Sequence, residues 1–520
     1  MSGLLLKRAW LGSVAVAAVC GFAACGGDDT SDDGSTAGKS STAGKSSGDA
    51  GAPGTSGSGN GGKTSTAGSA GTAGTAGSST GGSDVGGTNM GPGGAGGQGD
   101  VGGAGGDGAG GEGGTPPLAD WVRQQLAGTS PLPAAVPADP TNAYADNPAA
   151  ATLGQRFFFD EQFSGPMKID TDLGVTNELQ KVSCKSCHSG AALDDERTMP
   201  DNISKGTGLH SRNSPSLVNS SFYTWTNWGG RFAAQWELPL AVVENGVIMN
   251  GNRLALAHRI FDVYKADYEA VFGAMTAAIG TDAARFPAAG KPKAAAADPD
   301  GVWEAMAADD KVIINRILVN YSKALAAYTR KLVSREAKFD TFMTGDDAAL
   351  SASELNGAKL FIDHKCASCH NGAHFSDEGF HDLGVPQTGP GVLASDDGRF
   401  KDLPGLLGSA LNINGTYSDK QDTGKLAGLV NPPPDSMKGL FRTPSLRGIA
   451  QSAPYMHSGQ FATLSAVIDF YAVGGSLDTA MGELVPFAIT PQEKADLIAF
   501  LGTLTGKPVP DALLVDTAAN

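Results

Sequence analysis

Cys184-Lys185-Ser186-Cys187-His188 and Cys366-Ala367-Ser368-Cys369-His370 are the two stretches of this sequence that decide its fold. In each stretch two thiols lie three positions apart, and a histidine directly follows the second thiol. Thiols at this spacing can add to the two vinyl groups of one porphyrin, and the adjacent histidine can then bind the iron. The sequence therefore predicts two covalently bound haem c groups, with His188 and His370 as iron ligands.

A Cys-x-x-Cys pair is also typical of a zinc ribbon or of a thiol redox pair. Zinc would join both pairs in one tetrahedral site, and neither pair would need the histidine that follows it. The chain contains six cysteines, and the two outside these stretches, Cys20 and Cys25, lie near its start. None is left for a structural disulfide, although an exported protein could form one. This distribution favours haem.

Residues 1–25 are typical of a lipoprotein-type signal peptide. Basic residues at the start are followed by an apolar stretch that is too short to span a bilayer. The stretch ends in Phe22-Ala23-Ala24-Cys25, which resembles a lipobox with Cys25 as the lipidated residue. A plain cleaved signal is the alternative. Either signal predicts an exported protein, in the periplasm or at the outer membrane or cell surface.

Residues 26–116 are rich in Gly, Ser, Ala and Thr and contain almost no large apolar side chains. Such a segment cannot bury a core, so we predict a disordered tether. Contact with a membrane is expected only through the lipid anchor at Cys25.

The net charge of the chain is −16 at pH 7. An acidic surface is repelled by phosphates, which excludes nucleic acid as a partner. The same charge is compatible with a basic redox partner.

The remaining sequence predicts helices and few strands. Apolar residues recur at helical spacing over 310–332, and capping boxes begin at Ser351 and Thr490. We predict an all-α fold of two cytochrome c-like haem domains that pack together, one over 117–340 and one over 341–520.

Several further segments resemble, in the same order, those of the bacterial di-haem cytochrome c peroxidases, including the tyrosine-ligated relatives that mature methylamine dehydrogenase (MauG-like). The resemblance covers nearly all of 150–505. The segments that carry it are Leu153-Gly154 to Asp160, Arg212 to Leu217, Trp228 to Arg231, Asp397 to Arg399, Phe441 to Arg447 and Ala453 to Gly459.

This resemblance implies that His188 belongs to a catalytic, peroxide-binding haem and His370 to an electron-transfer haem. Trp228 matches the tryptophan that carries charge between the haems, although simple packing at the domain interface would also explain it. The family also holds a calcium ion between its domains. Asn213 matches the side-chain ligand, and Ser452 and Pro454 match positions whose backbone carbonyls bind the ion.

Tyr471 lies where electron-transfer members of the family have a methionine and the MauG-like relatives have a tyrosine. The resemblance thus implies Tyr471 as the second ligand of the C-terminal haem iron, and such a ligand favours high oxidation states. Met456 is the competing candidate, and packing in a helix is the alternative for Tyr471.

The sequence departs from the family at the peroxide site. The positions of the catalytic Gln and Glu are occupied by Leu238 and Ile248, which cannot move protons. Gln235 and Glu244 are close by and are the candidates to replace them. The position of the distal histidine holds Lys205, and His210 in the same loop is the candidate to cap the iron.

The resemblance implies an enzyme that reduces hydrogen peroxide with electrons from a small periplasmic cytochrome or cupredoxin. Because the Gln/Glu pair is absent, slow turnover is expected. Two alternatives stay open: a MauG-like oxidase of a protein or organic substrate, and a tethered electron-transfer or redox-sensing cytochrome without catalysis. A homodimer is a further expectation from the family.

Overall fold

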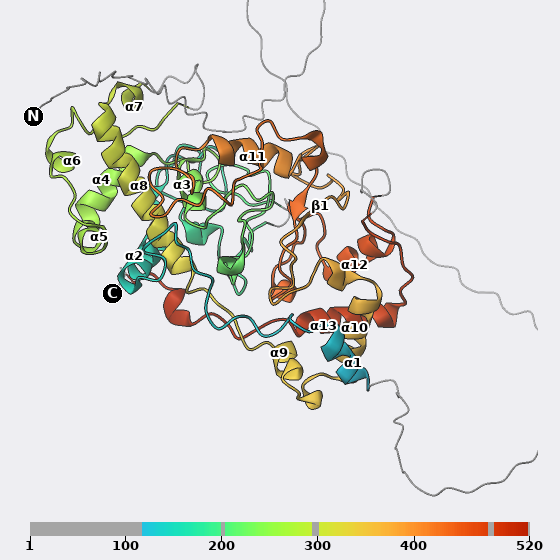
Figure 1. Cartoon of the computed structure of the whole chain (residues 1–520). Helices are drawn as coiled ribbons and strands as arrows, with labels where there is room; N and C mark the ends of the chain where they lie inside the picture. Colours follow the sequence, from blue (N-terminus) through green and yellow to red (C-terminus); the bar gives the residue numbers. More distant parts are fainter. Residues whose placement is uncertain (1–116, 199–202, 294–300, 477–482, 518–520) are drawn as a thin grey trace, which may run out of the picture. The chain divides into compact units, whose positions relative to one another are not determined.

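The computed structural model describes residues 117–198, 203–293, 301–476 and 483–517. The predicted signal peptide 1–25, with Cys25, and the predicted tether 26–116 lie outside these residues. The described part is rich in helices (Figure 1), as the sequence predicts. No helix within it combines the length and the apolar character that crossing a membrane requires.

The α-helices are α1 (Leu118–Gln125), α2 (Pro148–Phe159), α3 (Glu237–Glu244), α4 (Arg253–Val263), α5 (Lys265–Phe272), α6 (Ala278–Thr281), α7 (Val302–Ala305), α8 (Ala308–Thr329), α9 (Lys338–Met343), α10 (Ala352–Asp363), α11 (Arg399–Gly408), α12 (Leu464–Ala472) and α13 (Pro491–Gly502). Two short strands, β1 (Phe380–His381) and β2 (Phe441–Arg442), pair antiparallel, with Phe380 opposite Arg442.

A first apolar core forms where α2 packs against α8. The helix predicted over 310–332 is confirmed as α8, which is buried on all sides from Ile317 to Tyr328. Gly154 permits the close approach of the two helices, because a Cβ atom there would lie 2.0 Å from the carbonyl oxygen of Ala324. This core supports the first Cys-rich stretch, whose Cys184 packs against it.

A second apolar core forms where α10 packs against α13, and Gly357 has the same function as Gly154. A Cβ atom on Gly357 would lie 2.0 Å from the carbonyl oxygen of Asp496. Both predicted capping boxes are confirmed, and they begin α10 at Ser351 and α13 at Thr490. Helix α10 leads directly into the second Cys-rich stretch.

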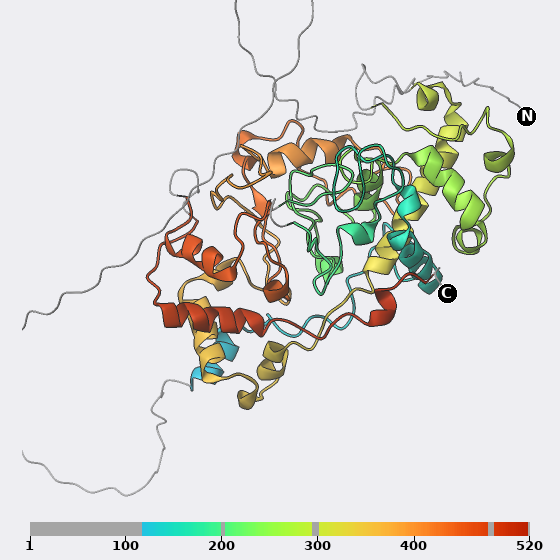
Figure 2. The same cartoon turned by 180° about the vertical axis from the view of Figure 1, so that it is seen from behind.

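The apolar packing crosses the domain division that the sequence places at residue 340. Helix α1, at the start of the predicted first domain, packs in the second core through Val122 and Leu126. Conversely, Tyr417 and Val509 of the predicted second domain pack in the first core. Figures 1 and 2 show the last segment of the chain running from α13 to α2 and α8. Apolar burial therefore does not separate strictly at residue 340, because it follows contacts in space rather than chain order, and the domains 117–340 and 341–520 stay a prediction.

Candidate functional site

The first Cys-rich stretch forms a 3-10 turn over Cys184–Ser186, which is fixed by a hydrogen bond from the backbone N–H of Ser183 to Oγ of Ser186. The Nδ1–H group of His188 donates a hydrogen bond to the carbonyl oxygen of Leu193 at 2.9 Å. This bond fixes the tautomer and leaves Nε2 available to a metal. Burial lowers the pKa of His188, so the ring is neutral at pH 7, as an iron ligand must be.

The second stretch repeats this geometry. It forms a 3-10 turn over Cys366–Ser368, and the Nδ1–H group of His370 donates to the carbonyl oxygen of Phe375 at 3.1 Å. In both stretches the acceptor lies five residues after the histidine. The ring of Phe375 is fully buried against the second core, which anchors the acceptor.

No disulfide joins the four cysteines of the two stretches, all of which lie in the described part of the chain. Burial raises the pKa of Cys184, Cys187 and Cys366 to about 12. The raised pKa reflects the apolar surroundings of these three thiols.

A cavity of about 660 Å3 lies beside the second stretch. Its wall contains Cys366, Cys369 and His370, together with the side chains of Tyr471 and Met456. The lining is mainly apolar and includes Phe361, Leu446, Leu497 and Leu501. An apolar cavity of this size, with both thiols and the histidine of the second stretch in its wall, fits a covalently bound haem.

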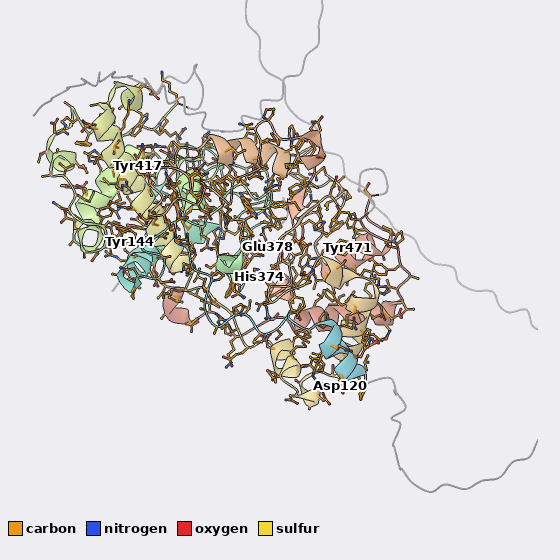
Figure 3. The ribbon with its side chains drawn as sticks, in the orientation of Figure 1. Asp120, Tyr144, His374, Glu378, Tyr417 and Tyr471 are labelled. Carbon is orange, nitrogen blue, oxygen red and sulfur yellow. The ribbon has the colours of Figure 1, made fainter. Side chains whose placement is uncertain are left out.

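Tyr471 lies on α12 at this cavity (Figure 3). Burial raises the pKa of its hydroxyl well above the usual value, and nearby Cys366 and Cys369 contribute to the shift. Met456 lines the same cavity and has a left-handed backbone, with φ of 71°. The structure therefore brings both candidate iron ligands to the cavity.

Trp228 and Asn213 line the same cavity. The indole N–H of Trp228 donates to the carbonyl oxygen of Asn213 at 2.8 Å, and the N–H of Arg442 donates to the carbonyl oxygen of Trp228 at 2.8 Å. Trp228 thus joins segments that the sequence assigns to different domains.

The side chain of Asn213 is buried, and its Oδ1 has no hydrogen-bond partner among the described residues. Such an atom is costly unless a partner is supplied. Ser452 and Pro454 line the same cavity. The three positions predicted for calcium thus contact one space, and the unpaired amide oxygen suits a hard cation.

Gln235 and Leu238 line a small cavity of about 70 Å3. Gln235 is held there by two serines: its Oε1 accepts from Ser221 at 3.0 Å and its Nε2 donates to Ser220 at 3.1 Å. Ile248 packs beside the first core. Gln235 therefore keeps a polar amide close to the position where the family has its catalytic glutamine.

Glu244 forms an ion pair with Arg253, in which the guanidinium contacts both carboxylate oxygens at 2.9 and 2.5 Å. The backbone N–H of Arg253 donates to the same carboxylate at 3.1 Å. This pairing stabilises the start of α4 and already engages both carboxylate oxygens of Glu244. A catalytic role for Glu244 stays a prediction that its surroundings do not favour.

His210 is half-buried, and its Nδ1 lies 2.9 Å from the carbonyl oxygen of Arg212. Burial lowers its pKa, so the ring is neutral at pH 7. A neutral imidazole can bind iron, so the role of a cap stays a prediction.

Sequence reasoning missed a buried network around Arg212. Its guanidinium contacts Asp396 at 2.6 Å and Asp402 at 2.7 Å, and lies over the ring of Phe441. The ring of His457 stacks on Phe441 at 3.8 Å, and burial lowers the pKa of His457 to about 4. The acids lie more than 180 residues from Arg212, so no local signal in the sequence indicates them.

Comparisons with known proteins point to one family. A family model described as di-haem cytochrome c peroxidase matches residues 148–348. The cytochrome-c peroxidase IdrP1 of Denitromonas iodatirespirans is 31% identical over 390 residues, which are 73% of this chain and 88% of that protein. The methylamine utilization protein MauG of Methylorubrum extorquens is 27% identical over 404 residues, 75% of this chain and 88% of that protein.

Among solved structures, the di-haem peroxidase BthA of Burkholderia thailandensis matches 73% of this chain and 92% of its own. The TM-score is 0.50 at 20% sequence identity, so this likeness concerns the fold alone.

Proposed function

Because the chain belongs to the di-haem cytochrome c peroxidase family, we propose that it reduces hydrogen peroxide with electrons from a small periplasmic cytochrome or cupredoxin. The observation that carries this proposal is the repeated turn in which His188 and His370 each donate Nδ1–H to a carbonyl. When bound, two haem c groups would supply the one-electron chemistry that cleaves the O–O bond.

The proposal gives the two stretches unequal roles in two packed cytochrome c-like domains. Cys184, Cys187 and His188 hold the haem that meets peroxide, and the second stretch holds the haem that receives electrons. Trp228 carries charge between them, and its two backbone hydrogen bonds support this role because they fix the ring at the junction.

The peroxide side has few groups that move protons. Leu238 and Ile248 offer none, and Gln235 can only orient a hydroxyl group by hydrogen bonding. We therefore expect turnover that is slower than with a Gln/Glu pair. The test is steady-state consumption of peroxide with a reduced cytochrome as donor. Turnover no faster than that of a free haem peptide at equal haem would contradict the proposal.

Tyr471 supports a second candidate function, that of a MauG-like oxidase of a protein or organic substrate. If its oxygen binds the second iron, Tyr471→Phe should change the electronic and EPR spectra of the oxidised protein, because an anionic oxygen ligand is lost. Met456→Leu is the matched control and should leave both spectra unchanged. The reverse pattern would assign the ligand to Met456 and remove this candidate.

Calcium binding is also part of the proposal, with the side chain of Asn213 and the carbonyls of Ser452 and Pro454 as ligands. Ca2+ at a hundredfold excess over its Kd should stabilise the folded protein by about 2.7 kcal/mol. Calorimetry should show a higher Tm with Ca2+ than with a chelator. Asn213→Ala should remove most of this difference, and an equal Ca2+ effect in that variant would contradict the site.

We further propose that the protein is exported to the periplasm or to the outer membrane or cell surface. Its anchor would be a lipid on Cys25, followed by a disordered tether over 26–116. A homodimer is compatible with the family. Nucleic acid is not expected as a partner, because the net charge of the chain is −16.

A further inference from the structure

Three oxidisable aromatic side chains lie on one short segment between the two Cys-rich stretches: Tyr223, Trp225 and Trp228. Tyr223 and Trp228 both line the large cavity, and Tyr223 also lines the small one. All three are half-buried. A strong oxidant generated nearby could therefore take an electron from any of the three side chains. Charge transfer between the two proposed haem sites requires one defined route among them.

Tyr223 carries a cation on its ring. The guanidinium carbon of Arg442 lies 3.5 Å from the ring centroid, and Arg442 is almost fully buried. His374 lies against the same ring at 4.4 Å, but burial lowers its pKa, so it adds no charge at pH 7. His374 and Glu378 lie side by side (Figure 3), with Nδ1 and Oε1 3.8 Å apart. Arg442 is thus the cation that acts on Tyr223, and Oε1 of Glu378, 3.7 Å from its Nη1, offsets part of its charge.

Trp225 carries two cations. The guanidinium carbon of Arg399 lies 5.0 Å from its ring, and the ammonium nitrogen of Lys425 lies 5.2 Å from it. Arg399 is buried and donates to the carbonyl oxygen of Gly229 at 3.3 Å. Lys425 donates to the carbonyl oxygen of Thr224 at 2.5 Å. Arg399 is therefore fixed at Gly229, and Lys425 is fixed at Thr224, the residue directly before Trp225.

Trp228 differs from its two neighbours. In the described part of the chain no arginine or lysine head group lies over its ring, and its indole N–H donates to the neutral carbonyl of Asn213. The negative end of that carbonyl dipole stabilises positive charge on the indole.

A cation over a neutral ring is attracted by the ring's quadrupole. Once the ring loses an electron it is positive, and the attraction becomes repulsion between two charges only a few ångströms apart. The cation therefore makes oxidation of that ring less favourable, and low exposure to water keeps the effect strong.

We propose that Arg442, Arg399 and Lys425 protect Tyr223 and Trp225 from oxidation and so confine the oxidising charge to Trp228. This inference rests on the proposed peroxidase function. In this proposal the three cations act as positioning residues. They determine which aromatic side chain is oxidised, and they do not contact a substrate.

The step that they suppress can be written in full. With no electron donor, peroxide draws its two electrons from side chains: 2 TyrOH + H2O2 → 2 TyrO• + 2 H2O. Each tyrosine first loses one electron, which makes its ring positive, and this is the step that a nearby cation disfavours. The phenolic proton then leaves, and the two electrons and two protons convert H2O2 into two waters as the O–O bond breaks. Such radicals end as oxidised or cross-linked residues, which peptide mass spectrometry detects.

To test this proposal, the protein with both haem groups is treated with H2O2 in the absence of an electron donor. The amount of oxidised Tyr223 is then measured in the wild type and in the variants Arg442→Gln and Arg442→Lys. We expect about a fivefold or greater increase in Arg442→Gln, because the charge is lost, and little increase in Arg442→Lys, which keeps it. Equal oxidation of Tyr223 in the three proteins would overturn the proposal. An increase in both variants would also overturn it, because it would assign the effect to packing.

Lys425→Gln and Lys425→Arg repeat the test at Trp225, so that the proposal stays testable if Arg442→Gln does not fold. Oxidised Trp225 should rise in the first variant and not in the second, and a failure of this contrast counts against the proposal. Peroxide consumption is recorded in every sample. A wild type that consumes no peroxide contradicts the proposed function, whereas consumption with unchanged oxidation patterns contradicts only the role of the cations.

Discussion

Replacing Trp228 by Phe is expected to slow peroxide turnover about a hundredfold, which corresponds to roughly 2.7 kcal/mol of added barrier. A benzene ring fills most of the same space but is much harder to oxidise than an indole. It also lacks the N–H group that donates to Asn213. The loss should appear in kcat and in kcat/KM alike, because the removed contribution belongs to the reaction and not to peroxide binding.

Trp225→Phe is the matched control, since it makes the same change three positions earlier on the same segment. This variant should keep nearly the turnover of the wild type. Both variants should keep both haem groups, which a pyridine haemochrome assay measures. Equal losses in the two variants would show that Trp228 contributes packing rather than charge transfer.

Replacing Cys184 and Cys187 together by Ser is expected to remove one haem c per chain and to abolish peroxide turnover. The thioether bonds cannot form, and His188 alone would hold the iron weakly. The equivalent double variant at Cys366 and Cys369 is the control. It should also lose one haem, but the remaining one should still react slowly with peroxide, because its own site is intact.

If the double variant at Cys184 and Cys187 reacted with peroxide at the wild-type rate, this result would contradict the unequal roles of the two stretches. Both variants need a check of folding by far-UV circular dichroism. Cys184 packs against the first core and Cys366 against the second, so part of any loss of stability has its origin in packing.

The parts of the fold that depend on neighbouring residues could be predicted from the sequence. The capping boxes at Ser351 and Thr490 and the helical spacing around Leu318 depend on residues a few positions apart. The place of α1 in the second core could not be predicted, because it depends on contacts with residues more than 200 positions away.

The same limit applies to the candidate site. The Cys-x-x-Cys-His stretches indicate their chemistry by spacing alone. The partner of Glu244 is Arg253, one loop further on, and no pattern in the sequence indicated that their charges would pair. Arg442 over Tyr223 joins positions more than 200 residues apart, so only the folded chain shows this contact.

The most direct test of the account is a titration of the fully reduced protein with hydrogen peroxide, with haem c counted in the same sample. One H2O2 molecule takes two electrons, so two linked haems should both be oxidised by one molar equivalent. We expect two haem c groups per chain, and we expect both to be completely oxidised at a ratio of one H2O2 per chain. A count other than two haems, or oxidation of one haem while the other stays reduced, would contradict it.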